Sequence, residues 1–242
     1  MDFLATDNPA GRDFQLFNTT HCCWIAATVI AGVALCLLYR RMQPSARRAV
    51  QRTIGLALMG TYIARQLILV ALGEYGIGYL PLHLCGMSIY IETIDSLFPN
   101  RFTRELCYAV CMPGAAMGLI YANWLYLPAV SFISITSFLF HSIMVIYPLL
   151  ALAGGDHRPS LKWLPACFGF LAAVSVPVFL FNRHFGTNYM FLSRPSPGSP
   201  LELFEQWFGN PGYLLGFVIM IAILWAVMYM PFAFAKKKTS EQ

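Results

Sequence analysis

One cysteine and one histidine in this sequence are of the types and in the surroundings that suit acyl transfer. Cys85 stands in "PLHLCGMSIY" and His141 in "FLFHSIMV", both within long apolar stretches. A cysteine in apolar surroundings stays an inert thiol unless a base or a positive charge favours its thiolate. His141 could be that base and could then pass its proton to a leaving oxygen. The two residues therefore predict a thiol nucleophile assisted by a histidine.

Further polar residues in the apolar stretches are expected to line the same cavity. An ionisable group in the middle of a bilayer costs about 2.5–3.5 kcal/mol on insertion scales, so such groups point inward to a partner or to water. At 100° per residue, Cys85, Ser88 and Glu92 share one helix face, and Ser137 and His141 share another. The residues predicted to bind substrate are Arg65, His83, Ser88, Glu92 and Ser137.

Arg65 has two open interpretations. The first expectation is a structural ion pair with Glu92, and the alternative is that Arg65 holds a lipid phosphate. Asp95 lies at the flank of the face that carries Glu92. The sequence does not decide whether Asp95 lines the lower part of the cavity.

The depth at which Cys85 and His141 meet depends on where the third helix begins. On a rise of about 1.5 Å per residue, a start at Leu80 leaves Cys85 too shallow, whereas a start at Tyr75 brings the two residues level. Pro81 and the glycines beside it make the first turn irregular, which would let His83 face inward.

The elements that must position these residues are predicted to be transmembrane helices. Of the 242 residues, 58% are hydrophobic and 11% are charged, whereas a soluble domain has about 25% charged residues. A spanning helix needs about 20 apolar residues. The fold class is therefore all-α, a polytopic membrane protein with seven spans. The predicted spans are Cys22–Tyr39, Ile54–Leu72, Leu80–Phe98, Leu106–Trp124, Val130–Leu150, Trp163–Asn182 and Tyr213–Phe234.

The distribution of lysine and arginine predicts the orientation. With the N-terminus outside and the C-terminus inside, twelve of the sixteen basic residues fall on the inner side, as the positive-inside rule requires. The chain then divides into a polar segment at 1–20, a transmembrane domain at 21–235 with a long outer loop at 183–212, and a basic tail at 236–242. The stretch "RRMQPSARRAVQR" is interpreted as a topology signal that meets anionic lipid headgroups, so no nucleic-acid partner is expected.

Several other functions are disfavoured by the residues. A retinal Schiff base needs a lysine inside the bundle, and every lysine lies in a loop or in the tail. The seven cysteines form no CxxC pair, so they predict buried apolar residues, not a disulfide framework or a zinc site. The histidines at 21, 157 and 184 are expected in solvated loops or interfaces. No metal and no soluble cofactor is expected.

Three motifs in this order carry a family resemblance: "LPLHLCGMSIY", "FLFHSIMV" and "GTNYMFLSRP". Over residues 20–235 the chain resembles the YwaF-like bacterial integral membrane proteins, whose vertebrate relatives are transmembrane acyltransferases of ether phospholipids. The resemblance implies a cysteine that takes an acyl chain from a phospholipid, which is Cys85 here, and an assisting histidine, which is His141. It also implies membrane phospholipids and lysophospholipids as partners and a bacterial inner (plasma) membrane as the location.

The sequence therefore leads to a lipid acyltransferase hypothesis with alternatives left open. In the leading hypothesis an acyl chain moves from a phospholipid to a lysophospholipid through a thioester on Cys85. If water replaces the acceptor, the same site is a lipid hydrolase. A non-enzymatic transporter or lipid-binding protein would use Arg65, Glu92, Asp95 and His141 along a pathway, although no inverted repeat supports it. A structural partner of a membrane complex would tolerate substitution at all these positions.

Overall fold

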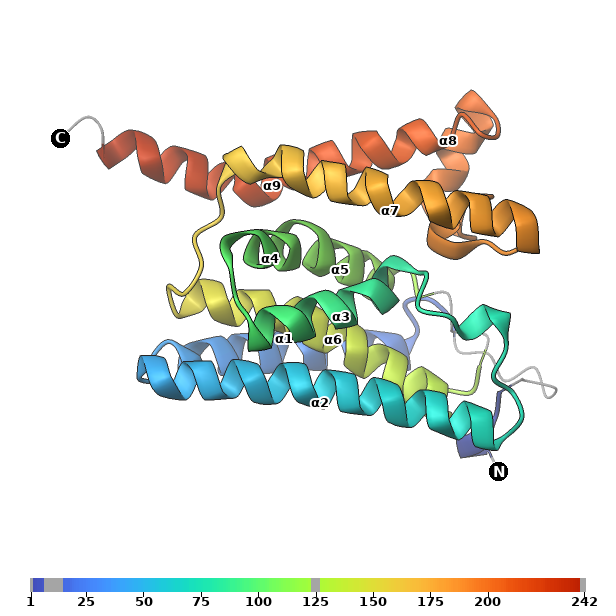
Figure 1. Cartoon of the computed structure of the whole chain (residues 1–242), viewed down its shortest axis with the longest axis horizontal. Coiled ribbons are helices and arrows are strands. Elements are labelled where there is room, and N and C mark those ends of the chain that lie inside the picture. Colours follow the sequence, from blue (N-terminus) through green and yellow to red (C-terminus); the bar gives the residue numbers. More distant parts are fainter. Residues whose placement is uncertain (1, 7–14, 123–126, 240–242) are drawn as a thin grey trace. The chain divides into compact units, whose positions relative to one another are not determined.

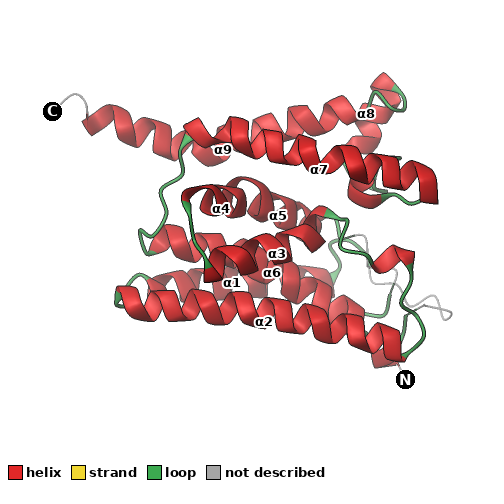
Figure 2. Cartoon of the chain, viewed as in Figure 1, coloured by secondary structure: helices red, strands yellow, loops and turns green. Residues whose placement is uncertain are grey.

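The computed structural model describes residues 2–6, 15–122 and 127–239, with side chains described up to residue 233. This part of the chain folds into helices joined by turns and contains no strand (Figure 1, Figure 2). It forms two compact units, Met1–His157 and Arg158–Gln242. The all-helical class predicted from the sequence is confirmed for the described residues.

The first unit is built around helix α6. Its contacts reach α1, α2, α3 and α5, and α2 packs along α3. In the most apolar window of α6, 56% of the residues are buried, against 17% in α1 and in α2. The polar stripe of α6 is therefore presented to other helices. The elements are η1 (Asp2–Leu4), α1 (Thr19–Tyr39), α2 (Pro44–Ala71), η2 (Ile77–Tyr79), α3 (Leu84–Leu97), α4 (Arg101–Leu106), η3 (Cys107–Cys111, a π-helical turn), α5 (Met112–Ile120) and α6 (Phe132–Ala153).

The second unit contains two long helices and the segment between them. Its elements are η4 (Leu161–Trp163), α7 (Leu164–Phe185), η5 (Tyr189–Phe191), α8 (Leu201–Phe208) and α9 (Leu214–Thr239). Helix α7 ends at Gly186, whose φ of 67° lies in the left-handed region that glycine adopts without strain. The buried Asn182 side chain then binds both the N–H and the carbonyl of Tyr189. The predicted outer loop is thus partly folded.

Among the described residues, five helices are long and apolar enough to cross a membrane: Thr19–Tyr39, Pro44–Ala71, Phe132–Ala153, Leu161–Phe185 and Leu214–Ala233. Four of them are mostly unburied within the protein, and large apolar side chains such as Ile30, Leu67 and Val176 are exposed. Such surface is stable when lipid covers it. The two other predicted spans take shorter forms. The first contains the 14-residue α3. The second runs from the end of α4 through η3 and α5, and its last residues, Asn123 and Trp124, lie outside the described residues.

Helix α3 begins later than predicted. It starts at Leu84, not at Leu80 or Tyr75, and Leu80 is extended (φ −63°, ψ 148°). The reason is Pro81, which disfavours helical geometry in the residue before it. The chain reaches α3 through η2 and an extended segment. This segment packs closely against the first turn of α3, because a Cβ on Gly86 would lie 3.0 Å from the Pro81 Cα.

Two histidines expected to be solvated are buried. His21 has no exposed surface: its Nδ1 accepts from the Phe17 N–H at 2.9 Å, and its Nε2 donates to the Leu119 carbonyl at 2.7 Å. His157 is 5% exposed, beneath arginines of α4. His184 is exposed, as predicted. Both corrections arise from tertiary contacts that neighbours in sequence do not reveal.

Candidate functional site

The broken start of α3 places Cys85 in the first turn of a helix. The first hydrogen bond inside α3 runs from the Met87 N–H to the His83 carbonyl at 3.1 Å, so the preceding N–H groups lie outside the helical ladder. The Cys85 sulfur lies against the N–H groups of Gly86 and of its own residue. Helix N-termini favour the thiolate form of a cysteine, whereas burial in apolar surroundings disfavours it. Cys85 therefore needs a base to become a nucleophile.

His141 is held in one tautomer by α6 itself. Its Nδ1 lies 2.7 Å from the carbonyl oxygen of Ser137, one turn earlier. Because a carbonyl only accepts, Nδ1 carries the hydrogen in the neutral imidazole. The lone pair is therefore on Nε2. A general base needs this tautomer, in which one nitrogen is fixed to the backbone and the other carries the lone pair.

Arg65 of α2 approaches the same turn of α6. Its Nη1 donates to the Ser137 Oγ at 3.1 Å, and its guanidinium lies 5.8 Å from the ring centroid of Phe140. Phe140 packs in the same apolar cluster as Cys85. A cation thus accompanies the thiol and the imidazole.

Two glycines of α5 bring the helices together. A Cβ on Gly118 would lie 2.5 Å from the His141 Cδ2 and 2.7 Å from its Nε2, so the imidazole packs directly on the α5 backbone. One turn earlier, a Cβ on Gly114 would lie 3.0 Å from a methyl group of Leu84, the residue before Cys85. The Gly-x-x-x-Gly motif permits the close approach of α5 to α3 and α6.

These residues border one apolar cluster. The partly buried Cys85 packs against a cluster in which α2, α3, α5 and α6 meet. His83 is the N-cap residue of α3. Arg65 reaches this cluster at Phe140, and His141 follows Phe140 on α6. We call Cys85, Arg65, His83, Ser137 and His141 the thiol site. The buried members of the apolar cluster are Leu58, Tyr62, Ile89, Ala115, Phe140 and Met144.

The predicted Arg65–Glu92 ion pair is wrong. Glu92 is fully buried, and within the described residues neither of its carboxyl oxygens has a hydrogen-bond partner. Because Glu92 lies seven residues beyond Cys85, about 10 Å along α3, it sits well below the level of Arg65. Ser88 lies between them, and its hydroxyl donates to the Leu84 carbonyl at 2.8 Å. The substrate-binding roles of Ser88 and Glu92 remain predictions.

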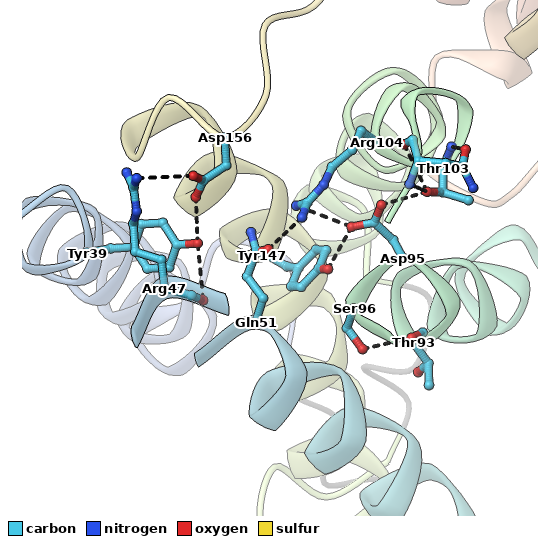
Figure 3. A network of polar contacts seen from close by, with 11 residues as sticks. Tyr39, Arg47, Gln51, Thr93, Asp95, Ser96, Thr103, Arg104, Tyr147 and Asp156 are labelled. Atoms are coloured by element: carbon cyan, nitrogen blue, oxygen red, sulfur yellow. Dashed lines mark hydrogen bonds and ion pairs between the residues drawn. The ribbon is translucent and has the colours of Figure 1, made fainter. Parts of the chain in front are cut away.

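A second polar region, at the other end of α3, was not predicted (Figure 3). The buried Asp95 accepts hydrogen bonds from Tyr147 and Thr103, each at 2.7 Å, and pairs with Arg104 at 3.3 Å. Arg104 also donates to the Gln51 Oε1 at 2.6 Å. We call these five residues the arginine network. The only signal in the sequence was the placement of Asp95 in an apolar stretch, which gives no information on its partners.

Beside the network, Asp156 binds the Tyr39 hydroxyl at 2.9 Å and pairs with Arg47 at 3.3 Å (Figure 3). Nowhere in the described part of the chain do three or more His, Cys, Asp or Glu side chains group so that they could hold a metal ion.

The apolar helices and the buried polar stripe define the class: this is an integral membrane protein with several membrane-spanning helices. A model of the TMEM164 family, a transmembrane family, matches residues 16–229, which is most of the chain. The chain therefore belongs to the TMEM164 family. No curated protein and no solved structure matches it.

Proposed function

We propose that this protein is an integral membrane lipid acyltransferase (transacylase) in which Cys85 and His141 move a fatty acyl chain from a phospholipid to a lysophospholipid. The observation that carries the proposal is the convergence at the thiol site. Cys85, in the first turn of α3, packs on an apolar cluster that includes Phe140; Arg65 lies over the Phe140 ring, and His141, with its lone pair on Nε2, is the next residue of α6. The resemblance to YwaF-like proteins and to the ether-phospholipid acyltransferases supports the same chemistry.

In the first half-reaction, His141 Nε2 takes the proton of the Cys85 thiol. The thiolate attacks the ester carbonyl carbon of the donor phospholipid, and the carbon–oxygen bond to the glycerol breaks. His141 returns the proton to the departing glycerol oxygen, which leaves a lysophospholipid and a thioester on Cys85. The N–H groups at the start of α3 stabilise the oxyanion that forms on the carbonyl oxygen.

In the second half-reaction, the hydroxyl of an acceptor lysophospholipid gives its proton to His141 Nε2. The hydroxyl oxygen attacks the thioester carbonyl, the carbon–sulfur bond breaks, and His141 returns the proton to the Cys85 sulfur. If water takes the place of the acceptor, a fatty acid is released. Hydrolysis is therefore the side reaction of the same site, and an apolar cluster that excludes water works against it.

Arg65 is proposed to bind the phosphate of the lipid. A guanidinium matches phosphate oxygens with two parallel N–H groups, and Ser137 and Phe140 orient this side chain at the thiol site. The proposal includes seven spans, with the α3 and the α4–α5 segments completing the bundle. It also includes an external N-terminus and a place in the bacterial inner membrane.

The test is acyl transfer by the purified full-length chain in nanodiscs. A phospholipid with a labelled acyl chain is supplied with a lysophospholipid acceptor, and labelled product is measured. With the acceptor omitted, intact mass should show one added acyl group that neutral hydroxylamine removes, as a thioester requires. Cys85→Ala and His141→Asn should each lower transfer by about 10³-fold or more.

The matched control is Cys36→Ser in α1, where a partly buried cysteine packs against a different cluster that includes Tyr39, Ile146 and Leu150. It should retain transfer. Undiminished transfer in Cys85→Ala would remove the proposed nucleophile. Release of labelled fatty acid at the full rate without acceptor would assign the site to a hydrolase instead.

A further inference from the structure

A cavity of about 390 Å³ lies at the far end of α2 from the thiol site. Arg48 at the cavity and Arg65 at the thiol site are 17 residues apart on α2, about 25 Å along its axis. The volume lies in the range of small-molecule sites, about 300–1,000 Å³. The lining residues are Pro44, Arg48, Gln51, Pro99, Asn100, Arg101, Arg104, Asp156 and His157. We call this the basic cavity.

The basic cavity has a buried floor and an open rim. Gln51 and His157 are 2% and 5% exposed and Arg104 is nearly buried, whereas Asn100 and Arg101 at the rim are exposed. The Gln51 Nε2 and the His157 Nε2 are buried and have no hydrogen-bond partner in the described part of the chain. A buried N–H group without a partner is costly, so the Gln51 amide presents a donor that a ligand could satisfy. The His157 Nε2, 3.9 Å from the Glu105 carboxylate, is a donor when it carries a proton.

Three arginines around the basic cavity pair with carboxylates of the described residues, and a fourth does not. Arg47 pairs with Asp156, Arg101 with the buried Glu105, and Arg104 with the buried Asp95, at 3.1–3.3 Å. Arg48 is partly buried at the cavity wall and has no hydrogen bond or ion pair within the residues that the structure describes. A negatively charged ligand would supply the missing partner.

We propose that the basic cavity binds the phosphate group of an anionic ligand through Arg48, Gln51, Arg104 and His157. Phosphate oxygens accept several hydrogen bonds at once and prefer guanidinium donors. The Asp156 carboxylate at the wall does not oppose binding, because it already accepts from Arg47 and Tyr39. The site is separate from the thiol site and does not depend on the proposed acyl transfer.

His157 adds a consistent electrostatic feature. Burial, together with Arg101 and Arg104, lowers the pKa of His157 to about 4. The floor of the empty cavity therefore holds a neutral imidazole at pH 7. A bound phosphate would favour the imidazolium and raise that pKa, so binding takes up protons and tightens as the pH falls towards 6.

The experiment measures ligand-dependent thermal stability of the purified full-length chain in detergent, followed by tryptophan fluorescence. One arm titrates inorganic phosphate against chloride at equal ionic strength. A second arm titrates dihexanoyl phosphatidic acid, with dihexanoyl phosphatidylcholine as its zwitterionic control. Saturable stabilisation by inorganic phosphate identifies a soluble anion, and stabilisation by phosphatidic acid alone identifies a lipid headgroup. Either result supports the site.

Variants test whether the stabilisation by phosphate arises at the basic cavity. Arg48→Gln should weaken phosphate binding at least tenfold, and Arg48→Lys should restore part of it. The matched control is Arg52→Gln, which removes an exposed arginine one turn further along α2, outside the cavity, and it should change binding less than twofold. Gln51→Glu keeps an acceptor for Arg104 but turns the floor against an anion, and it should abolish binding.

Two results would overturn the proposal. One is the absence of saturable stabilisation over chloride by either phosphate source. The other is equal weakening by Arg48→Gln and Arg52→Gln, which would mean that the effect follows net charge and not the cavity. The melting temperature of each variant without ligand shows whether it is folded.

Discussion

Helix α3 carries a different polar region at each end. At its C-terminal end the carboxylate of Asp95 accepts from Tyr147 and Thr103 and pairs with Arg104. At its N-terminal end the thiol site contains a thiol, an imidazole and a guanidinium, and Arg65 is held by a hydroxyl group and an aromatic ring. In one region a carboxylate pairs with a guanidinium, whereas in the other a guanidinium lies near a potential nucleophile.

The two regions differ in whether their buried charges contribute to stability or to activity. A charge with full hydrogen bonding holds helices in register, and removing one partner leaves the others uncompensated. A cation close to a nucleophile can attract a negatively charged substrate. The arginine network therefore predicts effects on stability, and the thiol site predicts effects on activity.

The largest effect is expected in the arginine network. Asp95→Ala leaves Arg104 buried without its acid and Tyr147 and Thr103 without an acceptor, which should lower the free energy of unfolding by about 3–5 kcal/mol. Unfolding of the detergent-solubilised protein would measure it. A change below about 1 kcal/mol would contradict the structural role of the network.

At the thiol site the sharpest change is Gly118→Ala. The added methyl group overlaps the His141 imidazole, so the ring must move away from its catalytic position. We expect acyl transfer to fall about 100-fold, equivalent to about 2.7 kcal/mol in the barrier, with a small change in melting temperature. Gly114→Ala is the matched control, because its methyl group meets only the flexible end of Leu84. Equal activity of the two variants would contradict the placement of His141.

The stability of the cavity region should depend on pH through His157. Its pKa is about 4 in the folded protein and about 6.5 when unfolded. Below pH 6.5 the unfolded state therefore binds more protons, so stability falls as the pH drops towards 4. Without phosphate, the loss between pH 7 and pH 5 should be about 2 kcal/mol.

His157→Gln should remove that loss, whereas the exposed His184→Gln should not. The nearest acid, Glu105, lies 3.9 Å from the His157 Nε2. It does not reverse the sign, because Arg101 pairs with the same carboxylate and burial disfavours the imidazolium. Identical pH profiles for His157→Gln and the unmodified protein would contradict this assignment.

The smallest effect is expected at Glu92, one turn before Asp95 on α3. Glu92→Gln breaks no hydrogen bond of the described residues, so the free energy of unfolding should change by less than about 1 kcal/mol. Comparing the free energies of unfolding of Glu92→Gln and Asp95→Asn in one assay shows how much the hydrogen-bond partners of a buried acid contribute to stability. Loss of lipid or ion flux in Glu92→Gln proteoliposomes, with Cys85→Ala unaffected, would favour the transport alternative.

Several features of the site follow from local sequence. The apolar runs predict the long helices, because about 20 apolar residues in a row have few other stable forms in a membrane protein. The spacing of Ser137 and His141 places them on one helix face, and the structure adds the hydrogen bond between the His141 Nδ1 and the Ser137 carbonyl. Pro81 indicates an irregular start of α3, but not the four or more residues by which the helix is shortened.

The sequence by itself determined the helical class, the membrane character and the chemically capable residues, because hydrophobic runs and helical periodicity are local properties. Only the tertiary structure decided the partners: Ser137 and not Glu92 for Arg65, Arg104 and Tyr147 for Asp95, and burial for His157. The physical reason is that an ion pair depends on the depth and rotation of two packed helices, and these are set by close contacts such as Gly118 against His141.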